Sequence, residues 1–227
     1  MVVKTHVSNM WKQIKLCGWE IKKNNEFLCL KSNVPLHRCN LAWNFQNQKN
    51  IDDAINFFQN NNFILYNSNF IESEYLELNG YMYEMELASN ITNGKTNPFL
   101  ISDSPDTLLW VKTLSLAVDQ DINLLYHFIN SMRCYCNFYL LLLLLDNKPI
   151  GTAAISIKQN IAVITFVTVL KEYRRHGIGS IITQEAIKFG TNIKARKFYL
   201  YASDNIASIY LKLGFSIKNT YTYYRSR

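Results

Sequence analysis

The part of the sequence best suited to chemistry is a glycine-bearing segment that follows an apolar stretch. Residues 161–169 are almost entirely apolar and lead into a loop in which two glycines stand two positions apart. A helical pattern starts directly after them. Glycine lets a backbone approach a ligand without a Cβ clash, and the unpaired N–H groups at a helix start carry partial positive charge. The spacing predicts a pyrophosphate cradle, formed by Arg174, Arg175, His176, Gly177, Ile178, Gly179 and Ser180.

Other interpretations of this loop have to be compared with that prediction. A P-loop ends in Gly-Lys-Ser/Thr, whereas here Gly179-Ser180 is followed by Ile181. The dinucleotide fingerprint needs three glycines, and only two are present. The sequence therefore excludes both motifs. On the local pattern alone, a plain strand-to-helix turn with an exposed basic loop stays open.

The elements that must position the loop follow a regular order in the C-terminal half. Two helical segments come first, and three strands separated by short turns lead to the loop. The third strand has almost no polar face, which is typical of a central strand covered on both sides. The predicted ranges are helices 107–118 and 121–130, strands 140–145, 150–157 and 161–169, helix 181–189, strand 198–202, helix 206–213 and strand 216–224.

The N-terminal half has weaker patterns. We expect a helix at 6–17, a hairpin of 19–22 and 27–31, a helix at 52–60, a strand at 63–66, a helix at 72–78 capped by Asn79-Gly80, and a strand at 81–87. Residues 89–106 are rich in Asn, Thr, Ser, Gly and Pro and predict a linker. The segments 75–81 and 210–215 echo each other, each after a helix and a strand and before an alternating strand. That order predicts a duplicated unit, with domains at 1–95 and 96–227.

Three motifs together resemble the Gcn5-related N-acetyltransferase (GNAT) superfamily. They are Arg174-x-x-Gly177-x-Gly179 after an apolar strand, the "NKPIGTAAI" hairpin turn, and Tyr210-x-x-x-Gly214-Phe215 at a helix end. The order of elements over residues 105–225 also matches. The resemblance implies a mixed, mostly antiparallel central sheet flanked by helices, an α/β (α+β) fold. The N-terminal half looks like the degenerate first repeat of tandem members and lacks the loop, so one cofactor site is expected.

The resemblance also implies roles for particular residues. In such enzymes the strand before the loop splays from its neighbour and binds the pantetheine arm, a role that falls here on Phe166, Val167, Thr168 and Val169. A backbone N–H near Val167 would stabilise the oxyanion. Tyr210 matches the usual general acid, although an aromatic core residue is its alternative interpretation.

The sequence departs from the family pattern at two points. Ser203, with Asn205 two residues on, stands where many members carry Asn. Residues 161–169 contain no carboxylate, so the usual general base is missing, and Asp119, Asp121 and Glu84 stay open as replacements. The expected reaction moves an acetyl group from acetyl-CoA to a primary amine by direct attack in a ternary complex. A non-catalytic acyl-CoA-binding sensor or subunit is the alternative.

Composition bounds the remaining functions. The formal net charge of +7 comes from Lys and Arg residues that are mostly scattered along the chain. The sequence also shows no recognised nucleic-acid-binding module, so we do not expect a nucleic-acid partner. The five cysteines form no CxxC pair, which argues against a metal site. The longest apolar run, residues 138–145, is too short for a bilayer crossing, and no secretory signal is visible. We therefore expect a cytoplasmic protein with a small-molecule or peptide amine as acceptor, no membrane partner and an unassigned oligomeric state.

Overall fold

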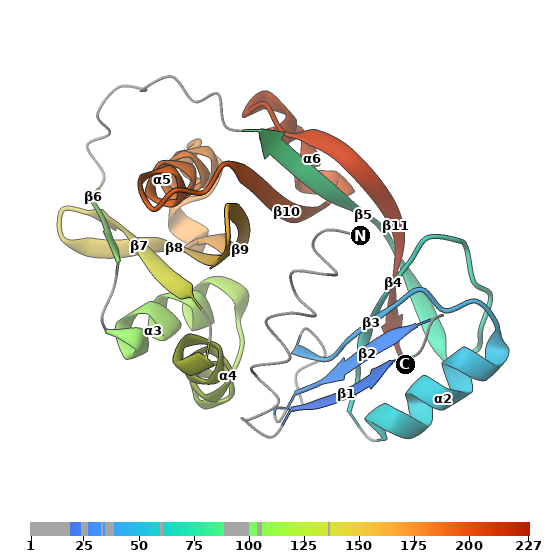
Figure 1. The fold of residues 1–227 in the computed structure, drawn as a ribbon. Coiled ribbons are helices and arrows are strands. Elements are labelled where there is room, and N and C mark those ends of the chain that lie inside the picture. Colours follow the sequence, from blue (N-terminus) through green and yellow to red (C-terminus); the bar gives the residue numbers. More distant parts are fainter. Residues whose placement is uncertain are drawn as a thin grey trace.

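The computed structural model describes residues 19–23, 27–32, 34, 39–59, 61–88, 100–103, 106–135 and 137–227. The described strands form one open sheet of eleven, in the order β1-β2-β3-β4-β11-β5-β10-β9-β8-β7-β6 (Figure 1). The N-terminal half contains β1 (Glu20–Lys23), β2 (Leu28–Lys31), β3 (Leu41–Trp43), α2 (Gln48–Phe58), β4 (Ile64–Asn67) and β5 (Leu76–Ala88).

The C-terminal half begins with a short strand, followed by two helices, three strands and then two further helices that alternate with the last two strands. Its elements are β6 (Leu100–Asp103), α3 (Thr107–Val118), α4 (Ile122–Tyr135), β7 (Phe138–Leu145), β8 (Lys148–Lys158), β9 (Ile161–Val169), a 3-10 turn (Lys171–Tyr173), α5 (Ile178–Asn192), β10 (Lys197–Ser203), α6 (Asp204–Lys212) and β11 (Ser216–Ser226). The sheet is mixed and mostly antiparallel and is flanked by helices, as the sequence predicts.

The two halves repeat one topology. In each half three antiparallel strands are followed by a helix that crosses to a parallel strand: β3 and β4 are joined through α2, and β9 and β10 through α5. A final antiparallel strand closes each half, β5 in the first and β11 in the second. The predicted duplication is thus visible in the order and pairing of the strands.

The final strands are exchanged between the halves. β5 of the N-terminal half pairs with β10 of the C-terminal half, whereas β11 of the C-terminal half pairs with β4 of the N-terminal half. β5 and β11 also pair with each other and form the seam of the continuous sheet (Figure 1). The predicted domain boundary near residue 95 stays a prediction. Strands from before and after this position pair with strands of the other half, so the sheet itself marks no boundary there.

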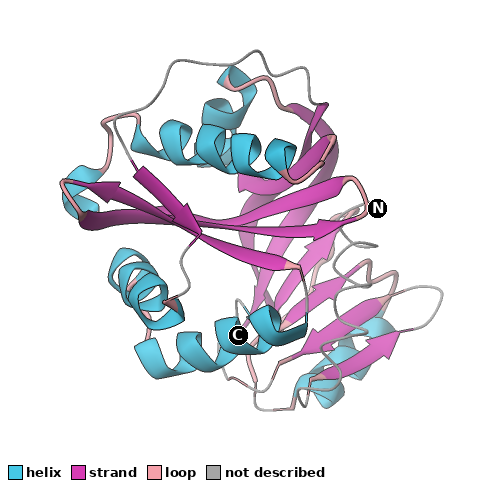
Figure 2. Cartoon of the chain, turned by 60° about the vertical axis from the view of Figure 1, so that its left-hand side comes forward, coloured by secondary structure: helices cyan, strands magenta, loops and turns pink. Residues whose placement is uncertain are grey.

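Helices cover both faces of the C-terminal part of the sheet (Figure 2). Along β7, Leu140 and Leu142 pack with α3 and α4, whereas Leu141 and Leu143 pack with α5 and α6. Consecutive side chains of a strand point to opposite faces, so an unbroken apolar run is what such a covered strand requires. The indole N–H of Trp110 donates to the carbonyl oxygens of Leu141 (3.0 Å) and Ala153 (3.2 Å) and fixes α3 on the sheet.

One predicted helix is wrong. Residues 76–78 begin the long strand β5 instead of a helix, and Leu76 pairs with Ser226 of β11. Gly80 has a φ of 118° inside this strand, near a register shift between Tyr223 and Tyr224. Asn79-Gly80 therefore marks a strand irregularity rather than a helix cap, because pairing with β11 prevails over local helical propensity.

Two other predictions need a separate statement. The predicted linker 89–106 contains a strand, β6, which pairs with β7, so the segment is not entirely a connection. Its residues 89–99 and 104–105 lie outside the described residues, as does the predicted helix 6–17. The remaining predicted helices and strands are present, with ends shifted by a few residues.

Candidate functional site

The parallel pairing of β9 and β10 involves only the first three of the nine residues of β9. The last paired residues are Val163 and Tyr199, although β9 runs on to Val169 and β10 to Ser203. β9 stays paired to β8 on its other side, and β10 stays paired to β5. The two strands therefore diverge, and the edge of β9 after Val163 is left without a partner strand on the β10 side.

A β-bulge sits in this unpaired part of β9. The register to β8 shifts between the pairs Thr152–Thr168 and Ala154–Thr165, and Phe166 takes a φ of 51°. The buried hydroxyl of Thr152 lies 3.0 Å from the Phe166 carbonyl oxygen, to which it donates, and 2.7 Å from the Thr168 hydroxyl. Bulges redirect a strand next to functional sites, and Thr152 holds this one in place.

Gly151 is needed for the same local geometry. A Cβ atom at this position would lie 2.6 Å from the Thr168 carbonyl oxygen, which is far inside van der Waals contact. Only glycine lets the two backbones approach this closely. Gly151 and Thr152 lie in the "NKPIGTAAI" segment that resembles the family's hairpin, but their role at the bulge was not predicted, because it depends on which part of β9 they face.

The glycine loop after β9 has the geometry of an anion site. Gly177 is the N-cap of α5 with a φ of 75° and makes no side-chain cap. The N–H groups of Ser180 and Ile181 both donate to the Gly177 carbonyl oxygen, so the N–H groups just before them have no partner within the helix. A Cβ atom at Gly177 or Gly179 would meet nothing within 4 Å. The backbone thus faces open space.

Of the charged or titratable side chains of the loop, Arg174 makes hydrogen bonds within the protein, whereas Arg175 and His176 face solvent. The Arg174 guanidinium donates to the carbonyl oxygens of Val169 (3.0 Å) and Ala117 (2.6 Å) and ties the loop to the end of α3. Arg175, with a φ of 65°, and His176 are exposed. Arg174 therefore positions the loop, and the exposed Arg175 adds its positive charge to the open side.

A pocket of about 390 Å³ lies where β9 and β10 diverge. It brings together four of the sequence-predicted residues: Phe166, Val167, Thr168 and Tyr210. Val169, the loop residues 174–180, Ser203 and Asn205 do not line it. Ser203 is the N-cap of α6 without a side-chain cap, and Asn205 is exposed in the first turn of that helix. These residues lie outside the pocket wall.

Tyr210 contributes a protonated hydroxyl to the pocket. The residue is 7% exposed and its ring contacts Phe215 at a centroid distance of 6.0 Å. Burial raises the pKa of Tyr210 to about 12. At neutral pH the phenol therefore keeps its proton and is a hydrogen-bond donor rather than a base.

The three candidate carboxylates differ sharply in position. Asp119 is the C-cap of α3, and Asp121 accepts from the N–H groups of Asn123 and Leu124 at the start of α4; both are exposed. Glu84 on β5 is only 1% exposed. It accepts hydrogen bonds from three donors at 3.2–3.3 Å, namely Tyr201, Asn219 and Tyr221. The Glu84 carboxylate accepts from a side chain of the pocket wall, Tyr201, whereas Asp119 and Asp121 flank the lining residue Gln120 in the chain.

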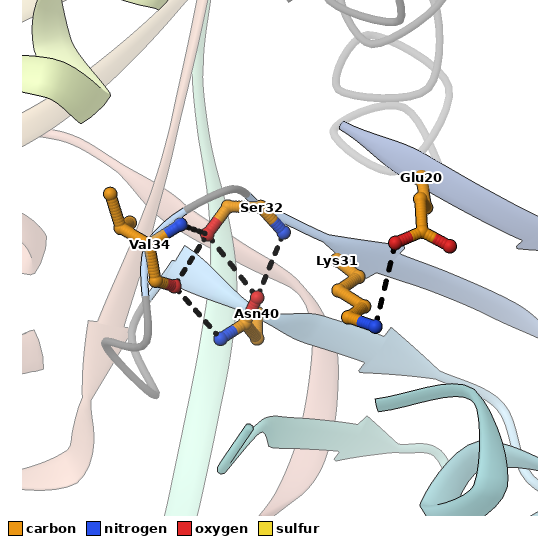
Figure 3. A network of polar contacts seen from close by, with 5 residues as sticks. All are labelled: Glu20, Lys31, Ser32, Val34 and Asn40. Atoms are coloured by element: carbon orange, nitrogen blue, oxygen red, sulfur yellow. Dashed lines mark hydrogen bonds and ion pairs between the residues drawn. The ribbon is translucent and has the colours of Figure 1, made fainter. Parts of the chain in front are cut away.

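The N-terminal half supplies another wall of the pocket. Cys39, Leu41 and Trp43 reach it from the β3 region and Tyr66 from β4. A buried polar network fixes the chain just before β3: Asn40 Oδ1 accepts from the Ser32 N–H at 2.8 Å, and Asn40 Nδ2 donates to the Val34 carbonyl oxygen at 3.4 Å (Figure 3). The same view shows the ion pair of Lys31 with Glu20 at 3.4 Å. This wall is therefore held rigidly.

The sequence model of the acetyltransferase (GNAT) family matches residues 108–215, which span the bulge, the loop and Tyr210. This part of the chain is a GNAT-family domain. A search among curated proteins finds no match. The GNAT domain thus contains the unpaired edge, the glycine loop and the tyrosine that the sequence motifs single out.

Solved structures share the fold over nearly the whole chain. A GCN5-related N-acetyltransferase from Kribbella flavida is 14% identical, with 97% of this chain and 94% of that chain covered and a TM-score of 0.65. One from Sphaerobacter thermophilus is 12% identical, with 90% and 81% covered and a TM-score of 0.64. A tandem GNAT protein from the clavulanic acid biosynthesis pathway is 10% identical, with 88% and 78% covered and a TM-score of 0.58. The GNAT fold therefore extends to the N-terminal half.

Two further observations concern metals and membranes. Within the part of the chain that the structure describes, no group of three or more His, Cys, Asp or Glu side chains is placed to hold a metal ion. The described helices also include none that is long and apolar enough to cross a bilayer.

Proposed function

We propose that the protein transfers an acetyl group from acetyl-CoA to a primary amine by direct attack in a ternary complex. The observation that carries this proposal is the bulged, unpaired edge of β9, which leads on one side into the uncapped N-terminus of α5 and on the other into the pocket with Tyr210. A donor bound along this edge would place its phosphates at the N-terminus of α5 and its thioester at the pocket.

Donor binding follows from the backbone. The loop of residues 174–180 would hold the pyrophosphate with its backbone N–H groups, since the backbone faces open space at Gly177 and Gly179 and the first N–H groups of α5 have no partner within the helix. The unpaired edge of residues 166–169 would bond the amides of the pantetheine arm, as a strand bonds its neighbour. Ser203 and Asn205, at the start of the helix that follows β10, would offer further polar groups to the donor.

The chemistry needs one electrophile and two proton movements. Acetyl-CoA supplies the thioester carbonyl, and a backbone N–H near Val167 would stabilise the negative charge that develops on its oxygen. Tyr210 would donate a proton toward the departing thiolate. Because a thiol has a pKa of about 8.5 and that of Tyr210 is about 12, full transfer is uphill, so the tyrosine has to recover a proton as the amine loses one.

The test is thermal melting with acetyl-CoA, followed by thiol release with amines. At about 100 times its dissociation constant, acetyl-CoA should stabilise the protein by roughly 2.7 kcal/mol, and Gly177→Asp should lose this stabilisation. Thiol should then be released when an amine is added. If the folded protein shows no shift with acetyl-CoA or with longer acyl-CoAs, the loop is only a turn and the proposal fails.

A non-catalytic acyl-CoA-binding protein is the second candidate. It is favoured by one observation: β9 carries no carboxylate, and neither does any described residue that lines the pocket. A melting shift with acetyl-CoA but no thiol release with any amine of a broad panel would establish this alternative. Thiol release with a single amine would exclude it.

A further inference from the structure

The side chains that line the pocket restrict the class of amine that could bind there as the acceptor. Three parts of the chain meet there: Trp43 and Tyr66 from the N-terminal half, Phe128 and Met132 from α4, and Phe166 and Tyr210 from the donor-binding part of the GNAT domain. Of the described residues that line the pocket, none carries a carboxylate, an ammonium or a guanidinium group. Among these described residues, a second charge on a bound molecule would lose its hydration without gaining an ionic partner, which is costly.

One end of the pocket has a different character. Tyr201 stacks on Tyr66 at a centroid distance of 5.5 Å and donates from its hydroxyl to Glu84 at 3.3 Å. Burial, and next the neighbouring Glu84, hold the pKa of Tyr201 well above its ordinary value. The Tyr201 hydroxyl directs its proton to Glu84 and its oxygen lies beside the Trp43 indole N–H, which leaves one lone pair to accept a hydrogen bond from an amine.

Taken together, these features define one kind of ligand. We propose that the acceptor is a primary amine on an apolar, uncharged body, aromatic or aliphatic, with its nitrogen at the Tyr201 end of the pocket. The proposal rests on the proposed acetyl transfer and specifies its substrate class. The N-terminal half thereby becomes part of the acceptor site, because Trp43 and Tyr66 form the wall against which the apolar body packs.

Amines of matched length test the proposal directly. With acetyl-CoA as donor, thiol release is compared for butylamine, 1,4-diaminobutane and 4-aminobutyrate, which differ in the group at the far end. We expect kcat/KM for butylamine to exceed that of both charged analogues by about 100-fold, because the apolar wall offers no partner for their second charge. Equal or higher values for either charged amine would overturn the proposal.

A homologous series gives a second readout. Propylamine, butylamine, pentylamine and hexylamine have nearly the same basicity, so they differ mainly in apolar surface. Each added methylene should raise kcat/KM roughly fourfold while it is buried. A flat series would contradict burial of the amine body. If octanoyl-CoA with a small amine instead reacts better than acetyl-CoA with hexylamine, the pocket holds the acyl chain and the proposal is wrong.

A pair of variants on α6 separates the pocket from general effects of added charge. Ile206 lines the pocket and is 40% exposed, whereas Leu211 on the same helix is 48% exposed and does not line it. Ile206→Asp should raise the ratio of kcat/KM for 1,4-diaminobutane over butylamine by at least about tenfold, and Leu211→Asp should leave it unchanged. The ratio is independent of how much active enzyme each preparation contains. An unchanged ratio in Ile206→Asp, or equal changes in both, would overturn the assignment.

These outcomes differ from failure of the proposed function. Melting with acetyl-CoA tests the donor site without any amine. If acetyl-CoA stabilises the protein and charged amines react best, acetyl transfer stands and only the acceptor class is wrong. If acetyl-CoA gives no stabilisation, the proposed function itself fails.

Discussion

The two halves of the molecule share one topology but treat the helix after their third strand in opposite ways. In the N-terminal half Asn47 is the N-cap of α2, and its side chain accepts from the Asn50 N–H at 3.0 Å. The Asn50 side chain in turn accepts from the Gln46 N–H at 2.8 Å. In the C-terminal half Gly177 caps α5 with no side chain at all. The first helix start is satisfied internally, and the second is left for a ligand.

The strands that precede these two helices, β3 and β9, also differ in whether their edge is fully paired. β3 is only three residues long, and all three pair with β4, whereas the last part of β9 runs on beyond its pairing with β10. Trp43 of β3 and Tyr66 of β4 contact each other at 5.7 Å between ring centroids and turn toward the pocket. Under the proposed function, the N-terminal repeat would serve catalysis by providing a wall of the pocket although it holds no donor site of its own.

The largest expected effect comes from exchanging the character of the two helix starts. Gly177→Asp places a negative charge where the proposed donor would bind its phosphates, and it forces an aspartate into a left-handed backbone. We expect kcat/KM for acetyl-CoA to fall by on the order of 1,000-fold, equivalent to about 4 kcal/mol. Steady-state thiol release at subsaturating acetyl-CoA measures this loss.

The matching change in the first half is the control. Asn47→Ala removes the cap of α2 and should cost about 1 kcal/mol of folding stability with no change in kcat/KM. A similar loss of activity in both variants would mean that the two helix starts do not differ in function, and it would contradict the assignment of the donor site to α5.

The next largest effect concerns Tyr210. Tyr210→Phe keeps the ring and removes the proton donor, so kcat should fall by about 100-fold while acetyl-CoA still stabilises the protein against heat. Tyr139→Phe is a matched control, since this tyrosine of β7 packs on Phe189 and does not line the pocket. Unchanged kcat in Tyr210→Phe would assign the ring to packing alone.

A smaller effect is expected from the residue that holds the bulge. Thr152→Val keeps the shape and removes the hydroxyl that bonds the Phe166 carbonyl, so the KM for acetyl-CoA should rise by about tenfold as the edge of β9 relaxes. Thr113→Val is the control: Thr113 is equally buried and bonds the Leu109 carbonyl within α3. Both variants should lose similar stability, of about 1 kcal/mol, but only Thr152→Val should change KM. Equal KM values would show that the bulge does not depend on Thr152.

The smallest effect concerns the ionisation of buried tyrosines, which changes folding stability only at alkaline pH. Burial raises the pKa of Tyr199 and of Tyr210 to about 12, and it also holds that of Tyr201 above its ordinary value. A tyrosine pKa that is higher in the folded state stabilises the fold below the unfolded value of about 10, and this contribution is lost as the pH rises from 10 toward 12. Melting temperature should fall over that window, with buried tyrosines ionising late by ultraviolet absorbance. Full ionisation of all tyrosines near pH 10 in folded protein would refute the burial of these hydroxyls.

Much of the C-terminal half could be predicted from sequence because its signals are local. The apolar run of β9, the glycines of the loop and the amphipathic helices each require only their own residues to be recognised. The N-terminal half was harder, because β5 takes its conformation from β11, which lies more than a hundred residues away in the chain. Residues 72–78 have a helical pattern, and long-range pairing overrides it.

The site shows the same division. The loop residues, the strand before it and Tyr210 were found from motifs, and their roles as individual residues stay predictions. The roles of Thr152 and Gly151, which lie in the "NKPIGTAAI" motif, and that of Tyr201 were missed, since each matters through a contact across strands: with Phe166, with Thr168 and with Glu84. No single position in the sequence signals such a contact.

The most direct test of the central claim is the stoichiometry of acetyl-CoA binding by titration calorimetry on the full chain. The structure has two related halves, and of their crossover helices α2 and α5 only α5 starts without a side-chain cap beside an unpaired edge of the preceding strand. We predict one acetyl-CoA bound per chain, lost in Gly177→Asp and kept in Asn47→Ala. Two molecules per chain, or binding that survives Gly177→Asp, would contradict the assignment of the donor site to the C-terminal half.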